Sequence, residues 1–135
     1  MLRSAKPARF LSNLDLRAHD AGEWVLLAPL SYRSAAGYLY QIPAWFITDL
    51  ASIPRLARPA IDQNGRSRRP AVLHDYLYCI KDGERSQADA LFLEALEAEG
   101  VGWFTRYAMW LAVRAGGWAY WNKRDGMTTE DFAHG

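Results

Sequence analysis

The hydrophobic pattern of the chain changes from strand-like to helix-like near residue 70, and this change restricts the fold more than any other feature. Before it, short apolar runs are separated by Pro and Gly: EWVLLAPL over 23–30, YLYQI over 38–42 and WFI over 45–47. Such runs predict a small antiparallel sheet or meander, with SYRSAAG over 31–37 as a hairpin connection. We therefore expect the first half of the chain to be rich in β-structure.

After residue 70 the apolar residues recur with a helical period. Pro70 fits the first turn of a helix, where its missing N–H group has no helical partner to lose. Ser86 and Asp89 resemble a capping box that opens a second helix. The pattern predicts three helices, which cover about 70–81, 86–99 and 103–115 and end at Asp82-Gly83, Gly100 and Gly116-Gly117.

These patterns predict an α+β fold in which a small N-terminal antiparallel sheet packs on about three C-terminal helices. A chain of 135 residues, half of them hydrophobic, can bury one core but is too short for two ordinary domains. We expect a single domain, 1–135, made of an N-terminal arm (1–20), a β-rich part (21–56), an exposed loop (57–69), a helical part (70–121) and a looser tail (122–135).

Composition excludes several classes of protein. Sixteen basic and fifteen acidic residues leave a net charge of +1, so nucleic acid is not expected as a partner. Cys79 is the only cysteine, which excludes an internal disulfide and a multi-cysteine metal site. No apolar run has the length of a signal peptide core or of a transmembrane segment, so we expect neither.

The strongest chemical signal is the adjacent pair His74 and Asp75 in LHDYLY, within an otherwise apolar stretch. On the predicted helix their neighbours at three and four positions include Leu77, Tyr78 and Cys79. An ionisable side chain in such surroundings is costly to bury unless it is paired, hydrogen-bonded or bound to a metal. Both residues therefore require partners from elsewhere in the chain.

Asp89 is the first candidate partner. Its neighbours at helical spacing, Phe92, Leu93 and Leu96, form the inward stripe of the second predicted helix, so Asp89 is expected to point toward the core. There it could accept a hydrogen bond from one ring nitrogen of His74 and leave the other nitrogen as a base. The alternative is that Asp89 only completes a capping box, and the pattern leaves both open.

Asp49, in TDLASIPR, is the second candidate. Together with Asp75 it could supply oxygen ligands to a divalent cation such as calcium. The alternative is an Asx-type turn that stabilises the end of a strand, to which Thr48 and Ser52 add hydrogen-bonding groups. Arg114 shares a helical face with several aromatic residues, so it either reaches inward to one of these carboxylates or extends to the surface.

Four ordered blocks resemble the family of unknown function numbered 1353, which is found largely in tailed bacteriophages and prophages. The resemblance covers about residues 23–121 and implies a phage or prophage origin, with the protein in the host cytoplasm or in the virion. It also implies other phage structural proteins or a cell-envelope substrate as partners. The blocks are TDLASIPR (48–55), LHDYLY (73–78), RSQADALF (85–92) and AVRAGG (112–117).

The run H-D-x-x-Y, followed by an inward Asp on the next helix, is similar to the phospholipases A2. That resemblance implies that His74 is the base that activates water, Asp75 binds calcium, Asp89 orients the histidine and Tyr78 adds a supporting hydroxyl. The glycine-rich calcium loop and the disulfides of those enzymes are absent from this chain. TDLASIPR is the segment that would take the place of the loop.

Two functions from different classes remain open. The first is a phage hydrolase that uses His74 as a general base on an ester or another cell-envelope bond. The second is a non-catalytic virion component, such as a tail or tail-tip protein, in which the His and Asp residues form a buried structural network. A cleft that holds His74, Asp75 and Asp89 favours the first, whereas an aromatic surface built from some of the six tryptophans favours the second.

Overall fold

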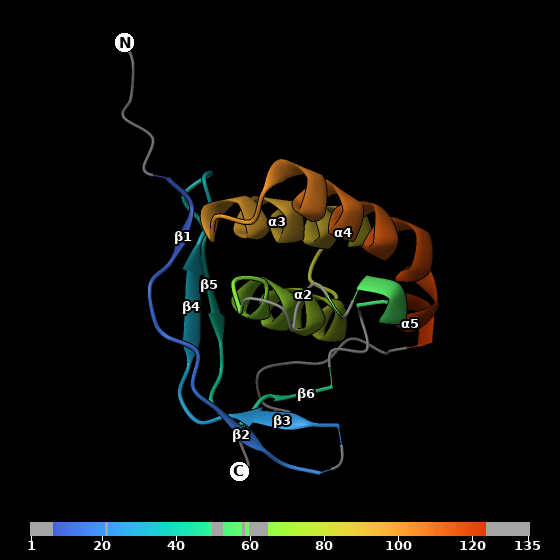
Figure 1. Cartoon of the computed structure of the whole chain (residues 1–135). Helices are drawn as coiled ribbons and strands as arrows, with labels where there is room; N and C mark the ends of the chain where they lie inside the picture. Colours follow the sequence, from blue (N-terminus) through green and yellow to red (C-terminus); the bar gives the residue numbers. More distant parts are fainter. Residues whose placement is uncertain (1–6, 21, 50–52, 58, 60–64, 124–135) are drawn as a thin grey trace.

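The computed structural model of the chain describes residues 7–20, 22–49, 53–57, 59 and 65–123. Within them, the first half forms two small antiparallel sheets and the second half is helical (Figure 1), which confirms the predicted α+β fold. The first sheet has the order β1-β4-β5 and the second has the order β2-β3-β6. The strands are β1 (Arg9–Phe10), β2 (Leu16–Ala18), β3 (Trp24–Leu26), β4 (Leu30–Arg33), β5 (Leu39–Ile42) and β6 (Ile47–Thr48).

The strands of the β-rich part differ in detail from the sequence pattern. The run 23–30 forms two strands, β3 and β4, which belong to different sheets, because the chain turns between Leu26 and Leu30. The predicted hairpin connection 31–37 is shorter, since β4 continues to Arg33. The predicted N-terminal arm also contributes β1 and β2. Strands of two or three residues are too short to show a recognisable alternation in sequence.

The helical half agrees with the sequence pattern to within two residues at each end. Pro70 lies in the first turn of α2, and the helix ends before Lys81, whose φ of 51° is left-handed. None of the helices in the described part of the chain is long and apolar enough to cross a lipid bilayer. After the short 3₁₀ helix η1 (Arg55–Ala57), the described helices are α2 (Arg68–Ile80), α3 (Arg85–Ala98), α4 (Trp103–Gly116) and α5 (Trp118–Lys123).

The capping box of α3 is built from different residues than those predicted. Glu84 is the N-cap, and the side chain of Gln87 accepts a hydrogen bond from its backbone N–H at 2.9 Å. Ser86 and Asp89 therefore do not form the box. Asp89 lies one turn inside α3 and is buried, so the prediction of a capping role was wrong.

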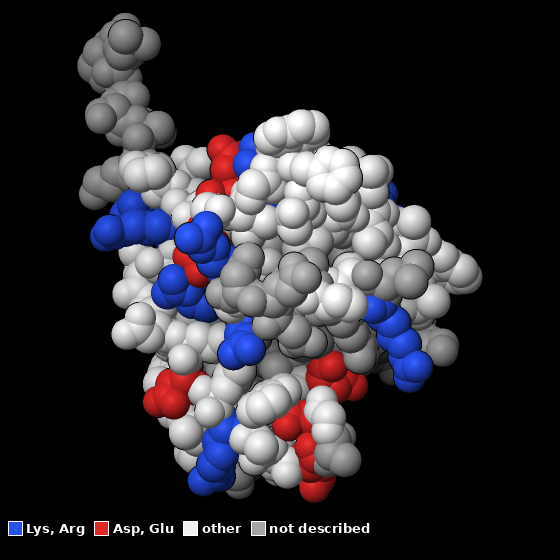
Figure 2. All heavy atoms as spheres, viewed as in Figure 1, with Lys and Arg blue, Asp and Glu red and all other residues white. Residues whose placement is uncertain are grey.

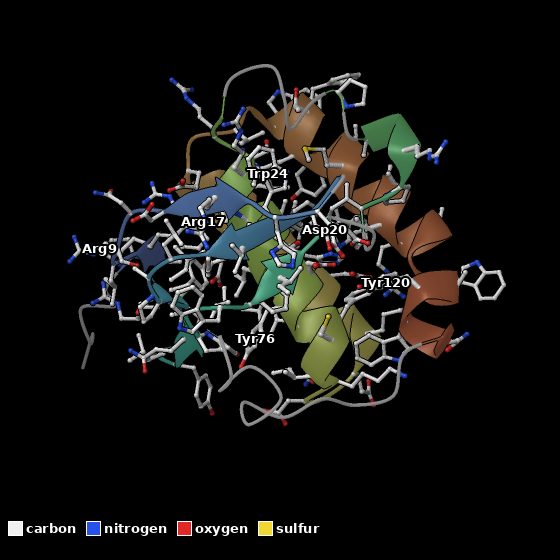
Figure 3. All side chains as sticks on the ribbon, turned by 90° about the horizontal axis from the view of Figure 1, so that it is seen from below. Arg9, Arg17, Asp20, Trp24, Tyr76 and Tyr120 are labelled. Carbon is white, nitrogen blue, oxygen red and sulfur yellow. The ribbon has the colours of Figure 1, made fainter. Side chains whose placement is uncertain are left out.

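Helix α2 is the centre of the molecule. Figure 1 shows it between the first sheet, the α3–α4 pair and α5, and Figure 3 shows the β2–β3 hairpin crossing it from below. All ten residues from Pro70 to Cys79 are buried. α5 packs Trp121 edge-on against Tyr78, with 5.1 Å between ring centroids. The predicted tail lies outside the described residues from residue 124 onward.

Candidate functional site

The burial of α2 brings His74 to the middle of the helical core, where it meets Asp89 of α3. Nε2 of His74 and Oδ1 of Asp89 are 2.6 Å apart, and both side chains have an exposed fraction of 0%. The imidazole also packs against the ring of Phe92, at 4.7 Å between centroids. The predicted partnership of His74 and Asp89 is therefore present in the structure.

Three further donors converge on the Asp89 carboxylate. Tyr78, one helical turn after His74, donates its hydroxyl to Oδ1 at 2.6 Å. Arg114 of α4 donates Nη1 to Oδ2 at 2.8 Å, and Arg85 donates Nη1 to the same oxygen at 3.4 Å. Arg114 thus takes the inward orientation that was one of its two predicted alternatives. We call the set His74, Tyr78, Arg85, Asp89 and Arg114 the Asp89 network.

The surroundings of Asp89 determine its charge. Burial raises the pKa of the carboxyl group, but the hydrogen bond from His74, the positive charge that His74 can carry, and the hydrogen bonds from Tyr78 and Arg114 outweigh that effect, and the pKa is lowered from its ordinary value. Asp89 is therefore ionised near neutral pH. Burial and the hydrogen bond to Asp89 raise the pKa of Tyr78, so its hydroxyl keeps the proton that it donates.

An ionised Asp89 also fixes the role of one ring nitrogen of His74. A carboxylate can only accept a hydrogen bond, so Nε2 carries the hydrogen of this bond. The aspartate thus holds both the tautomer and the orientation of the ring. A histidine held in this way can act as a general base.

Asp75, the neighbour of His74 in the chain, is bonded to a strand residue instead of to Asp89. It is buried, and Thr48 at the end of β6 donates its hydroxyl to Oδ2 of Asp75 at 2.6 Å. This bond joins α2 to the second sheet. Asp49 directly follows Thr48 and is exposed, so the two predicted calcium ligands occupy different environments. Ser52 lies outside the described residues.

Among the described residues, one cluster of three ligand side chains could share a metal ion. It consists of His19, Asp20 and Glu23 at the exposed turn between β2 and β3, where Figure 3 labels Asp20. Asp49 and Asp75 provide only two carboxylates, fewer than the six to eight oxygen ligands of calcium. Their role as metal ligands stays a prediction.

Sequence reasoning missed two residues of these contacts. Arg85 lies four positions before Asp89, and this i,i+4 spacing of opposite charges could have identified it. It also donates to the backbone carbonyls of Val113 and Arg114, at 3.2 and 3.3 Å, which ties α3 to the end of α4. Thr48 was considered only as a local turn residue, because its partner lies 27 positions away.

His74, Tyr78 and Asp89 are fully buried, whereas the side chains of Arg85 and Arg114 are 19% and 33% exposed. Two surface hollows lined by described residues have volumes of about 640 and 310 Å³, and neither is lined by His74, Asp75 or Asp89. The larger is bordered by arginines of the α2 start, and the smaller lies between α3 and the β4–β5 turn.

Comparison with known proteins places these residues in a described family. The family model "Protein of unknown function (DUF1353)" matches residues 24–113. Five of the six predicted site residues lie within the match, and Arg114 directly follows it. No match was found among curated proteins or among solved structures.

Proposed function

The chain belongs to the DUF1353 family, whose function is unknown, and we propose that it is a hydrolase in which His74 is the general base. The observation that carries the proposal is the 2.6 Å contact between His74 and an ionised, fully buried Asp89. Tyr78 of α2, the helix of His74, and Arg114 of α4 hold the same carboxylate of α3, so the partner of His74 is itself fixed in position. The arrangement supports the roles implied by the resemblance to phospholipases A2.

The reaction that fits this arrangement is ester hydrolysis. In the proposed reaction His74 takes a proton from water as the water oxygen forms a bond to the ester carbonyl carbon. When the resulting tetrahedral intermediate collapses, the C–O bond to the leaving alcohol breaks and His74 returns the proton to that oxygen. Asp89 acts as a positioning residue, because its negative charge stabilises the imidazolium that forms between the two steps.

Calcium is the proposed cofactor, with Asp75 and Asp49 as its ligands. Carboxylate oxygens are ligands that calcium prefers, and the hydrogen bond from Thr48 would hold the Asp75 carboxylate in a fixed orientation. When bound there, the ion would supply positive charge for an oxyanion. We propose a phage or prophage gene product that acts on an ester or another bond of the cell envelope, on the strength of the four sequence blocks.

The test compares hydrolysis by the wild-type protein and by His74→Gln, using ester lipids in vesicles and purified peptidoglycan. Loss of a general base lowers the rate by about 10²–10⁴-fold. Glu94→Gln is the matched control, because Glu94 is also a carboxylate of α3 that accepts a tyrosine hydroxyl, from Tyr32, outside the Asp89 network. A folded His74→Gln variant as active as the control would exclude the proposed role.

A second function is favoured by the complete burial of His74, Tyr78 and Asp89. In a non-catalytic virion component, such as a tail or tail-tip protein, the Asp89 network would serve only to lock α2, α3 and α4 together. In that case neither vesicle lipids nor peptidoglycan are hydrolysed by the wild-type protein. The Asp89 variants then lose stability without any change in a reaction.

A further inference from the structure

Helix α4 presents a second apolar face, on the side away from the core. Met109 and Val113 are buried, as expected for its inner face. The outer positions Phe104, Tyr107 and Leu111 repeat at helical spacing, and Phe104 and Leu111 are 73% and 60% exposed. The outer face of a surface helix is ordinarily polar. An exposed apolar stripe at this place is therefore typical of an interaction surface.

Aromatic side chains extend this stripe at both ends of the helix. Trp103 at its beginning and Trp118 just after its end are also exposed. Figure 2 shows a broad area without charged side chains over the part of the molecule where Figure 1 places α4. We call Trp103, Phe104, Tyr107, Leu111 and Trp118 the α4 face.

Basic side chains outnumber acidic ones near the α4 face. The sequence contains no Asp or Glu between residues 100 and 124, whereas Arg and Lys occur four times there, and of these Arg114 points inward to Asp89. Arg66 donates to the carbonyl of Gly100 at 3.3 Å, directly before α4, and the exposed Arg68 follows it in the chain. Two carboxylates lie just before α4: Glu97 pairs with Arg106 at 3.8 Å, and Glu99 pairs with Arg69 at 2.8 Å. A net charge of +1 for the whole chain conceals this local excess.

We propose that the α4 face docks on a lipid bilayer that contains anionic headgroups. Helices that lie in the membrane interface typically carry Trp, Phe and Leu on one side and basic residues beside them. Fourteen residues of helix are about 21 Å long, less than the ~30 Å hydrocarbon core, so α4 would lie in the surface rather than cross it.

The charge distribution decides between a bilayer and a second copy of the chain. Pairing of two α4 faces would bring the arginines of one copy toward those of the other, with few carboxylates to oppose them. Anionic headgroups instead complement a basic rim. This docking does not depend on the proposed hydrolase. If the hydrolase is correct, however, the bilayer would supply its ester, and Arg114 would link the docked helix to Asp89.

Sedimentation with vesicles tests the docking without reference to activity. The full chain is mixed with vesicles of phosphatidylcholine and phosphatidylglycerol, and with vesicles of phosphatidylcholine alone. We expect sedimentation with the anionic vesicles, weakened by salt, and at least about a tenfold lower partition for Phe104→Ser/Leu111→Ser, because two apolar side chains no longer leave water. His74→Gln should bind as the wild type does, which separates this test from that of the hydrolase.

The matched control is Tyr38→Ser/Leu39→Ser, which removes an aromatic and an aliphatic side chain that are 68% and 56% exposed near the β4–β5 turn. This variant should retain wild-type binding. The proposal is overturned if the wild-type protein stays in solution with anionic vesicles, or if both double variants bind equally. It is also overturned if light scattering shows a dimer that Phe104→Ser/Leu111→Ser dissociates and no vesicle binding accompanies it.

Discussion

His74 and Asp89, fifteen positions apart in the chain, meet at 2.6 Å where neither side chain has any contact with solvent. Water cannot replace a partner that is lost at such a place, so each group depends on the other for its hydrogen bond and charge. The stability of the helical half should therefore respond strongly to small chemical changes at Asp89.

Asp89→Asn should lower the free energy of unfolding by about 3 kcal/mol, because it removes one partner of a buried charged network and leaves the cation of Arg114 beside it. Urea unfolding, followed by circular dichroism, measures the change. Glu94→Gln, on the same helix and half-buried, should cost about 1 kcal/mol or less. Equal losses in the two variants would show that the Asp89 network has no special weight.

The stability supplied by Asp89 should depend on pH in one direction. The pKa of Asp89 is lower in the folded than in the unfolded state, so between these two pKa values the folded protein binds fewer protons than the unfolded chain. The stability that the Asp89 carboxylate contributes is therefore lost as the pH falls below about 4. Melting temperatures of the wild type and of Asp89→Asn should therefore differ by a constant amount above about pH 5 and converge as the pH falls from about 4 to 2. A constant difference across that range would contradict the lowered pKa.

Gly117→Ala should destabilise the protein by about 1–3 kcal/mol. A methyl group at this position would lie 2.6 Å from the carbonyl oxygen of Val113 and 2.7 Å from the hydroxyl of Tyr78, so it would push on the network. Gly102→Ala is the control, because its methyl group would meet nothing within 4 Å. Thermal melting measures both variants. A melting temperature of Gly117→Ala equal to that of the wild type and of Gly102→Ala would contradict the close contact of residue 117 with Tyr78.

Calcium should raise the melting temperature of the wild-type protein if Asp75 and Asp49 bind it, and Asp75→Asn should abolish the shift. Saturation at about one hundred times Kd corresponds to ~2.7 kcal/mol of added stability. Asp20→Asn tests the exposed cluster with His19 and Glu23. A shift lost only in Asp20→Asn would assign the ion to that turn, and no shift in the wild type would remove calcium from the proposed mechanism.

The helices and the inward side chains could be predicted because their signals are local. Periodicity and the glycine stops gave the bounds of three helices, and the apolar neighbours of Asp89 indicated its direction. The predicted capping box of Ser86 and Asp89 was wrong, because Glu84 and Gln87 form the box instead. Glu84 is a less common N-cap residue, and Gln87 follows it at the same three-residue spacing. Local spacing alone could not choose between the two.

The missing parts of the prediction depend on residues that are distant in sequence. β1 has two residues and pairs with β4, more than twenty positions later, so its pattern carries almost no signal. The bond from Thr48 to Asp75 joins a strand end to a helix and has no fixed spacing that a sequence could reveal. Tertiary packing determines such contacts, whereas helical period determines where His74 and Asp75 point.

The convergence of donors on Asp89 also bears on how the helical half opens. His74 and Tyr78 come from α2, Arg85 from α3 itself and Arg114 from α4, so separation of α2 or α4 from α3 leaves the buried carboxylate short of donors. Partial opening is therefore nearly as costly as complete opening. Amide hydrogen exchange should show the three helices with similar protection, as a single cooperative unit rather than a series of helices that detach in turn.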